Sequence, residues 1–91
     1  MDKVLIITGG GRGIGAAVAR QAADSGYTVA VNYQRDAAAA EALVTAIRNK
    51  GGRASAFQAD IGAADEVERL FKEVERDLGT AVALVNNAGI T

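Results

Sequence analysis

A cluster of glycines near the amino end is the segment of this sequence best suited to chemistry. Five glycines fall within seven residues there, in the segment Thr8-Gly9-Gly10-Gly11-Arg12-Gly13-Ile14-Gly15. Glycine permits positive φ angles and leaves no Cβ in the way of an approaching ligand. A helix that begins directly after such a turn attracts anions through its free N–H groups and its partial positive charge. The segment therefore predicts a phosphate-binding site. It suits a pyrophosphate best, because the turn and the helix end can each bind one group.

Three glycine motifs have to be distinguished in this segment. The P-loop motif requires Lys directly after its last glycine, but Ala16 follows Gly15, so the Lys that grips the phosphates is missing. The dinucleotide fingerprint Gly-x-Gly-x-x-[Gly/Ala] is present at Gly11, Gly13 and Ala16. A second frame, Thr-Gly-x-x-x-Gly-x-Gly, is present at Thr8, Gly9, Gly13 and Gly15. Either of the last two favours a dinucleotide over a mononucleotide, and a merely flexible turn is the alternative.

The composition excludes several other kinds of chemistry. The chain has 91 residues, enough for one small domain, and contains neither His nor Cys. Disulfides, thiolate nucleophiles, His-based triads and Cys/His zinc sites are therefore ruled out, and no metal site is expected. With 10 Lys and Arg against 11 Asp and Glu, the chain has no general attraction to nucleic acid or anionic lipid.

The apolar segments are too short for a membrane protein. No apolar run approaches the roughly 20 residues that span a bilayer. The N-terminal residues Met1-Asp2-Lys3 lead directly into a short apolar run without the layout of a signal peptide. We therefore expect a cytoplasmic protein.

Two hydrophobic periods alternate along the chain and predict strands that alternate with helices. Short apolar runs predict buried strands at 4–7, 29–31, 54–59 and 81–85. Helical spacing between them predicts apolar faces of Ala17, Val18, Gln21 (the one polar exception) and Ala22; of Ala40, Leu43, Val44 and Ile47; and of Val67, Leu70, Phe71, Val74 and Leu78. Gly26, Gly51 and Gly79 stand where the helices would end, and Asp36 is expected to cap the second helix.

The order β-α-β-α-β-α-β defines the expected fold class. Parallel strands joined by right-handed helical crossovers give an α/β fold, the Rossmann-type doubly wound parallel sheet, of which residues 1–91 would form the N-terminal portion. The fourth strand would lie beside the first and leave an unpaired apolar edge.

Three motifs together resemble the short-chain dehydrogenase/reductase family. They occur in the family's order: the Thr-Gly-x-x-x-Gly-x-Gly frame at Thr8, then Asp60 after the third strand, then the segment Asn86-Asn87-Ala88-Gly89 after the fourth. The resemblance covers residues 3–91. It is nearest to the branch of 3-oxoacyl-carrier-protein reductases and glucose dehydrogenases, through the glycine segment and Val31-Asn32-Tyr33.

The resemblance assigns a role to each motif residue. Gly9 would make the tight turn, Gly13 would let the backbone approach the pyrophosphate, Gly15 would let the helix pack on the strand, and the N–H of Ile14 would bind phosphate. Gly11 belongs to the same phosphate-binding turn.

The other two motifs would complete the site at the ends of the third and fourth strands. The Thr8 hydroxyl would tie the turn to Asn87, and Asp60 would accept from the adenine amino group with Ile61 lining that pocket. The residues along the ribose on the nicotinamide side would be Asn86, Ala88 and Gly89. Without the family context, Asp60 could be a solvated strand-end carboxylate and the two Asn residues an ordinary turn.

The end of the second strand favours one cofactor over the other. NAD-binding folds place an acid about 20 residues after the glycine turn, where it binds the ribose 2′-hydroxyl. Here that region reads Asn32-Tyr33-Gln34-Arg35, with no carboxylate before Asp36, and its last three residues are expected to bind the cofactor. Arg12 and Arg35 could instead bind a 2′-phosphate. We therefore predict NADP(H), with NAD(H) the less favoured alternative and a surface position the alternative for Arg35.

The catalytic residues of the family are missing from this sequence. The family transfers hydride between a nicotinamide and an alcohol or carbonyl carbon, with a Ser and a Tyr-x-x-x-Lys pair. The only tyrosines are Tyr27 and Tyr33, and the residues four positions later are Val31 and Ala37. No catalytic residue is assigned. These 91 residues are expected to be the N-terminal, cofactor-binding part of a longer oxidoreductase and to be inactive alone.

Other interpretations remain open at this stage. The chain could be a non-catalytic dinucleotide-binding module, or a fragment that functions only with another subunit. A methyltransferase-like domain would explain neither a pyrophosphate site nor the segment that begins at Asn86. The resemblance implies a nicotinamide dinucleotide, a small alcohol or carbonyl substrate for the full-length parent, and a homo-oligomer.

Overall fold

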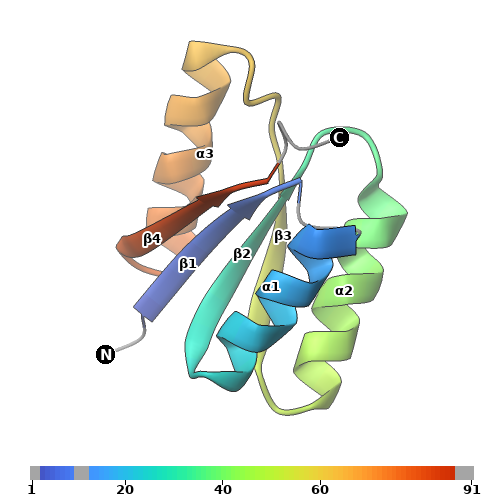
Figure 1. The fold of residues 1–91 in the computed structure, drawn as a ribbon. Coiled ribbons are helices and arrows are strands. Elements are labelled where there is room, and N and C mark those ends of the chain that lie inside the picture. The colour runs from blue at the N-terminus through green and yellow to red at the C-terminus, as the bar shows by residue number, and fades with distance from the viewer. Residues whose placement is uncertain (1–2, 10–12, 88–91) are drawn as a thin grey trace.

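Residues 3–9 and 13–87 are described by a computed structural model, and they form one four-stranded parallel sheet with helices on both faces (Figure 1). The elements follow one another as β1 (Lys3–Thr8), α1 (Gly13–Asp24), β2 (Tyr27–Tyr33), α2 (Ala37–Asn49), β3 (Arg53–Gln58), α3 (Ala64–Asp77) and β4 (Ala81–Asn86). The predicted α/β fold is confirmed. Among these residues, no helix is both long and apolar enough to cross a membrane.

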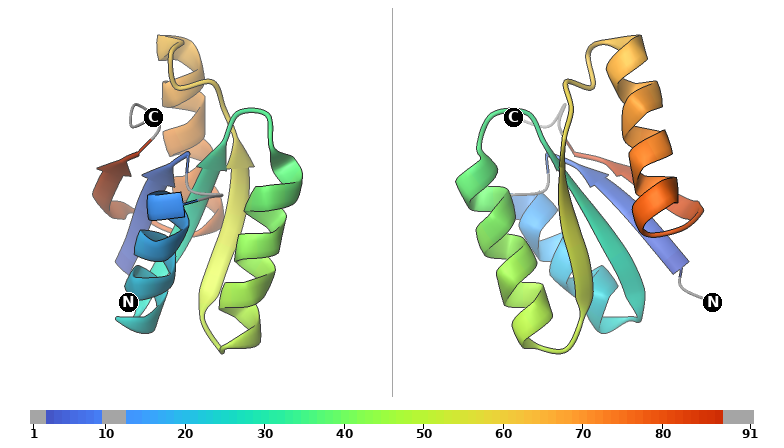
Figure 2. Two further views of the ribbon diagram at one scale, coloured as in Figure 1. Left: turned by 45° about the vertical axis from the view of Figure 1, so that its right-hand side comes forward. Right: turned by 180° about the vertical axis from the view of Figure 1, so that it is seen from behind.

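The strand order places the carboxyl ends of all four strands at one edge of the sheet. The order is β3-β2-β1-β4, so the chain reverses direction across the sheet between β1 and β4. Right-handed crossovers then put α1 and α2 on one face and α3 on the other (Figure 2). Thr8 pairs with Asn86, and Tyr33 with Gln58, at that carboxyl edge. Ligands of doubly wound sheets bind at such a reversal point.

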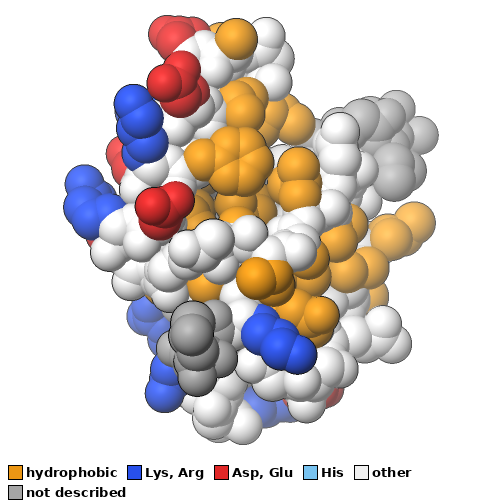
Figure 3. All heavy atoms as spheres, turned by 90° about the vertical axis from the view of Figure 1, so that its left-hand side faces the viewer, with side chains coloured by type: hydrophobic (Ala, Val, Ile, Leu, Met, Phe, Trp, Pro, Cys, Tyr) orange, Lys and Arg blue, Asp and Glu red, His pale blue; other side chains and the backbone are white. Residues whose placement is uncertain are grey.

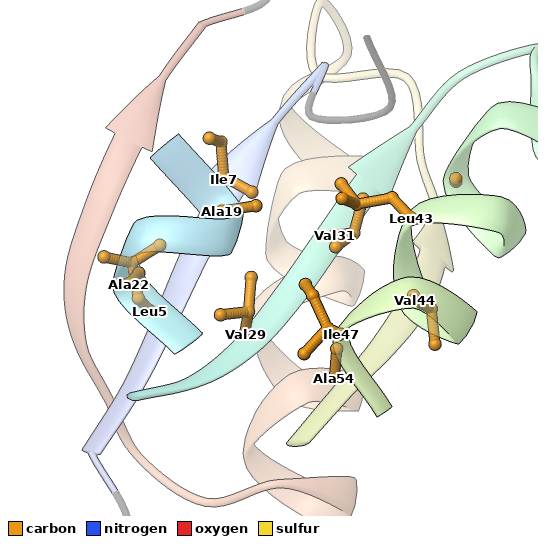
Figure 4. Close-up of a cluster of buried hydrophobic side chains, with 11 residues drawn as sticks. Leu5, Ile7, Ala19, Ala22, Val29, Val31, Leu43, Val44, Ile47 and Ala54 are labelled. Carbon is orange, nitrogen blue, oxygen red and sulfur yellow. The ribbon is translucent and has the colours of Figure 1, made fainter. Parts of the chain in front are cut away.

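The central strands β1 and β2 are apolar on both sides because each side packs against helices. Along β1, Leu5 and Ile7 enter the cluster beneath α1 and α2, whereas Ile6 enters the cluster beneath α3. The first cluster is drawn in Figure 4, where side chains of β1 and β2 lie between α1 and α2. This two-sided burial explains why the strands read as continuous apolar runs rather than as alternating ones.

The predicted ends of the helices agree with the structure. Asp36 caps α2, and its carboxylate accepts from the N–H of Ala39 at 3.0 Å. Gly26, Gly51 and Gly79 have φ angles of +98°, +86° and +117°, which side chains rarely adopt. Each glycine lets the chain leave its helix and enter the next strand.

The predicted apolar face of α1 is correct only in part: Ala22 is buried and Val18 packs against the core, but the other two members are not buried. The structure buries Gly15, Ala19 and Ala22, whereas Ala17 and Gln21 are exposed. These three buried residues lie at i, i+4 and i+7, on one face of the helix. Because their side chains are absent or a single methyl group, this face can approach the sheet closely.

One side of the sheet carries exposed apolar side chains. Phe71, predicted on the buried face of α3, is 39% exposed, while Val82 and Leu84 on β4 are 61% and 53% exposed. We call these three residues the β4 patch. Figure 3 shows hydrophobic side chains gathered where α3 and β4 face the viewer. Within the described part of the chain, β4 pairs only with β1, so its outer edge is free.

Candidate functional site

Two glycines with positive φ angles lead the chain from β1 into α1. Gly9 follows Thr8 with φ +61°, and Gly13 is the first residue of α1 with φ +57°. A Cβ at Gly13 would meet no atom within 4 Å, so its backbone angle, not crowding, requires glycine there. Helix α1 thus presents its free N–H groups at the carboxyl edge. Gly11 and Arg12 lie outside the described residues.

Thr8 fastens this turn to the end of β4. Its hydroxyl accepts from the N–H of Asn87 at 3.0 Å, which is the contact expected from the sequence. The same hydroxyl donates to Asn86 Oδ1 at 3.1 Å, and Val85 O is an alternative acceptor at 3.4 Å. Asn87 Nδ2 donates in turn to Gly9 O at 3.0 Å. The reversal point of the sheet is thus closed by side chains from both strands.

Replacing Thr8 with valine is expected to destabilise the chain by about 1–3 kcal/mol, the usual cost of leaving a buried polar partner unsatisfied. Thr8 is only 5% exposed, so water cannot replace the hydroxyl. Urea unfolding measures the change. Thr45→Val on the exposed side of α2 is the matched control, and equal destabilisation by both variants would contradict this assignment.

At the end of β2, the side chains of Gln34 and Arg35 are exposed and Tyr33 is half-buried. The guanidinium of Arg35 makes no hydrogen bond or ion pair with any part of the chain that is described, so it can bind a ligand anion. Asp36, the first carboxylate after the strand, is engaged as the cap of α2. Within the described residues, this strand end thus offers an exposed cation, Arg35, and a carboxylate that already caps a helix.

Asp60 lies in the turn between β3 and α3. Its Oδ1 accepts from the N–H of Gly62 at 2.9 Å, and its carbonyl oxygen accepts from the N–H of Ala63 at 3.1 Å. Ile61 is half-buried against the cluster beneath α3. Gly9, Arg35 and Asp60 follow the carboxyl ends of β1, β2 and β3, so the structure brings them to the same edge of the sheet. Figure 1 shows these three strand ends side by side. Ala88 and Gly89 lie outside the described residues.

Three residues that support this edge were missed by the sequence analysis. Asn32 near the end of β2 is buried, and its amide donates to one carbonyl group within β3 and to one just after it. Glu66 and Arg69 on α3 bind the backbone of Asp60 and Gln58. The hydrogen bond that Arg69 donates to the Glu73 carboxylate raises the pKa of Arg69 above its usual value. The one sequence signal was a polar residue, Asn32, at the end of an apolar run.

A hollow elsewhere on the molecule does not compete with this site. It has a volume of about 200 Å³ and lies between the ends of α1 and α2, with Arg20, Asp24 and Lys50 in its lining. These are the carboxyl ends of the helices, whose partial negative charge disfavours anions. Within the described ranges, no group of three or more acidic residues could hold a metal ion.

The comparisons with known proteins identify the family. The family model described as short chain dehydrogenase matches residues 3–91. A dinucleotide-type glycine turn at the reversal point of a doubly wound sheet is the arrangement expected of such a protein. This chain belongs to the short-chain dehydrogenase family.

Three similar proteins illustrate the match. The chain is 48% identical over 91 residues to 3-oxoacyl-[acyl-carrier-protein] reductase FabG of Staphylococcus aureus (strain N315), covering 100% of this chain and 37% of that protein. It is 42% identical to the short-chain dehydrogenase/reductase homolog YusS of Bacillus subtilis (strain 168), covering 100% of this chain and 84% of that protein. A dehydrogenase of Burkholderia cenocepacia with bound NADP superimposes with a TM-score of 0.86 at 38% identity, covering 93% of this chain and 33% of the other. The chain thus spans little more than a third of the reductase's length.

Proposed function

We propose that this chain is the NADP(H)-binding part of an oxidoreductase that transfers hydride between a nicotinamide and an alcohol or carbonyl substrate. The observation that carries the proposal is the pair of positive φ angles at Gly9 and Gly13, which lead from β1 into the N-terminus of α1. Backbone N–H groups at such a turn bind a diphosphate without a charged side chain. Gly11, Ile14 and Gly15 belong to the same turn and helix start.

The adenosine half of the cofactor would lie across the ends of β2 and β3. Arg35, with Arg12 as a second candidate, would bind the 2′-phosphate, and Tyr33 and Gln34 would line the ribose. Asp60 would accept from the adenine amino group beside Ile61. Arg35 is exposed and has no ion pair among the described residues, and Asp36 is engaged as a helix cap. Both observations support NADP(H) over NAD(H). The NADP in the Burkholderia cenocepacia relative is in keeping with this preference.

The nicotinamide half would lie near the end of β4, along Asn86, Ala88 and Gly89, with Asn87 and Thr8 bracing the turn. When bound, the nicotinamide supplies or accepts the hydride. The chain's own residues bind and orient the cofactor, and a Tyr-x-x-x-Lys pair does not occur among them.

We also propose that further polypeptide completes this domain and supplies the catalytic residues. The free edge of β4 can pair with another parallel strand. A right-handed crossover to that strand would place its helix on the α3 face, over the β4 patch. The 37% share of FabG that this chain covers agrees with a domain of greater length.

The proposal is tested by titrating the chain with NADPH and following the fluorescence of the reduced nicotinamide. We expect saturable binding, tighter for NADPH than for NADH, and no reduction of a carbonyl substrate by residues 1–91 alone. S-adenosylmethionine serves as the control for a methyltransferase-like site and should not displace NADPH. Equal affinities for NADPH and NADH would refute the cofactor assignment, and turnover by this chain would refute the assignment of catalysis to other polypeptide.

A further inference from the structure

Asn32 is a buried amide at the end of an apolar strand. Its side chain is 2% exposed, and Nδ2 donates to Ala59 O at 3.2 Å and to Phe57 O at 3.3 Å. Burying an amide is costly unless it is hydrogen-bonded, so its place here calls for a structural reason. These bonds cross from β2 to the segment immediately before Asp60.

Further bonds join the same two strand ends. The N–H of Ala59 donates to Tyr33 O at 3.0 Å, and Gln58 Nε2 donates to Gln34 O at 3.1 Å. The strand pairing ends at Tyr33 and Gln58, so Asn32 and Ala59 extend the connection one residue beyond the sheet. The backbone that leads to Asp60 is thereby held at a fixed distance from the backbone that leads to Arg35.

Helix α3 holds the other side of this segment. Glu66 Oε1 accepts from the N–H of Asp60 at 2.8 Å, and Arg69 donates to Gln58 O at 3.2 Å. Glu66 and Arg69 also pair with each other at 3.2 Å, with side chains 36% and 43% exposed. Exposed ion pairs contribute little stability, so these contacts matter chiefly for geometry. Since they remain when Asn32 is changed, the segment would shift rather than detach.

We propose that Asn32 is a positioning residue for the adenosine half of the dinucleotide. It lies too deep to touch a ligand, and it acts by setting the distance between the 2′-phosphate-binding end of β2 and the adenine-binding turn at Asp60. This inference rests on the proposed NADP(H) site. It assigns to the buried strand end a part in cofactor affinity that the exposed residues alone do not explain.

The test compares Asn32→Ala with Thr28→Val, a matched loss of a buried polar group at the opposite end of β2, where Thr28 is 4% exposed. Two probes are titrated: 2′,5′-ADP, which spans the adenosine site, and inorganic pyrophosphate, which needs only the glycine turn. We expect Asn32→Ala to lower the affinity for 2′,5′-ADP about tenfold. Removing a residue that orients the ligands of a metal site has an effect of similar size. Pyrophosphate affinity should change less than about twofold, and Thr28→Val should alter neither affinity.

A second measurement needs no ligand. Hydrogen exchange at the amides of Ala59 and Asp60 should become faster in Asn32→Ala, while exchange at Ile7 stays slow. If Asn32→Ala does not fold, Asn32→Ser, which keeps one donor, replaces it and should give a smaller change in the same direction. The role of Asn32 is overturned if hydrogen exchange at these amides is unchanged, or if the affinities for the two probes fall equally. Failure of the unaltered chain to bind either probe overturns the NADP(H) site itself.

Discussion

Arg35→Glu is expected to weaken NADPH binding by about 10- to 150-fold, because a hydrogen bond to a charged group contributes about 1.5–3 kcal/mol. The guanidinium of Arg35 is exposed and makes no contact within the described residues that would hold it elsewhere. A glutamate at this position would repel the 2′-phosphate and could accept from a 2′-hydroxyl. NADH affinity should therefore stay constant or rise. Fluorescence titration with both cofactors measures the ratio of the NADPH affinity to the NADH affinity.

Arg20→Glu is the matched control for that experiment. Arg20 is exposed on α1 and lines the hollow at the opposite end of the helices, so the same change in charge occurs away from the carboxyl edge. This control should leave the ratio of the two affinities, for NADPH and for NADH, unaltered. If Arg35→Glu left the ratio unaltered as well, selectivity would have to come from another residue, and Arg12 would be the next to replace.

Ile7→Ala is expected to lower the free energy of unfolding by about 2–5 kcal/mol, the usual cost of removing a buried aliphatic side chain. Ile7 is 0% exposed and belongs to the cluster beneath α1 and α2, together with Val31 and Ala19 (Figure 4). Typical proteins unfold at a cost of about 5–15 kcal/mol, so this variant would lose a large part of its stability. Chemical denaturation followed by circular dichroism measures the difference.

The same substitution at an exposed position provides the control. Ile14 is 66% exposed at the start of α1, and Ile14→Ala should change stability by less than about 0.5 kcal/mol. Because its predicted role uses the backbone N–H, this variant should also retain cofactor binding. Similar destabilisation by the two alanine variants would show that the cluster does not hold the sheet and α1 together as described.

The elements that the sequence predicts correctly are those that depend on local signals. Asp36 caps its helix and Gly26 ends one because capping and positive φ angles are properties of a few neighbouring residues. The central strands β1 and β2 were found because burial on both faces leaves continuous apolar runs. The doubly wound topology that the family resemblance implies placed β4 beside β1, and the strand order agrees with it.

The elements that the sequence misjudges depend on distant contacts. Most of α1 consists of Ala and Gly, so hydrophobicity does not distinguish Ala17, which is exposed, from Ala19, which is buried. Phe71 follows the helical spacing of the buried face, but it lies where the sheet beneath α3 ends in the free edge of β4. The role of Asn32 was missed because its partners, Phe57 O and Ala59 O, lie 25 and 27 residues away.

The sequence predicts which segments form the candidate site, but not how their side chains are held in place. The family resemblance, carried by the glycine turn, Asp60 and Asn87, predicted which strand ends meet. The bond from Asn87 to Thr8 agrees with that expectation. The braces from Glu66 and Arg69 could not be predicted, since each is one of several charged residues on an exposed helix.

The central claim is that the glycine turn and the N-terminus of α1 bind the diphosphate of NADP(H). The most direct test is a titration of the ¹⁵N-labelled chain with NADPH, followed by amide chemical shifts. The account predicts saturable shifts at Gly9, at residues 13–15 and at Asp60, with the amide of Lys50 unmoved. If the chain remains folded at saturating NADPH and the amide chemical shifts of these residues do not change, the claim is contradicted.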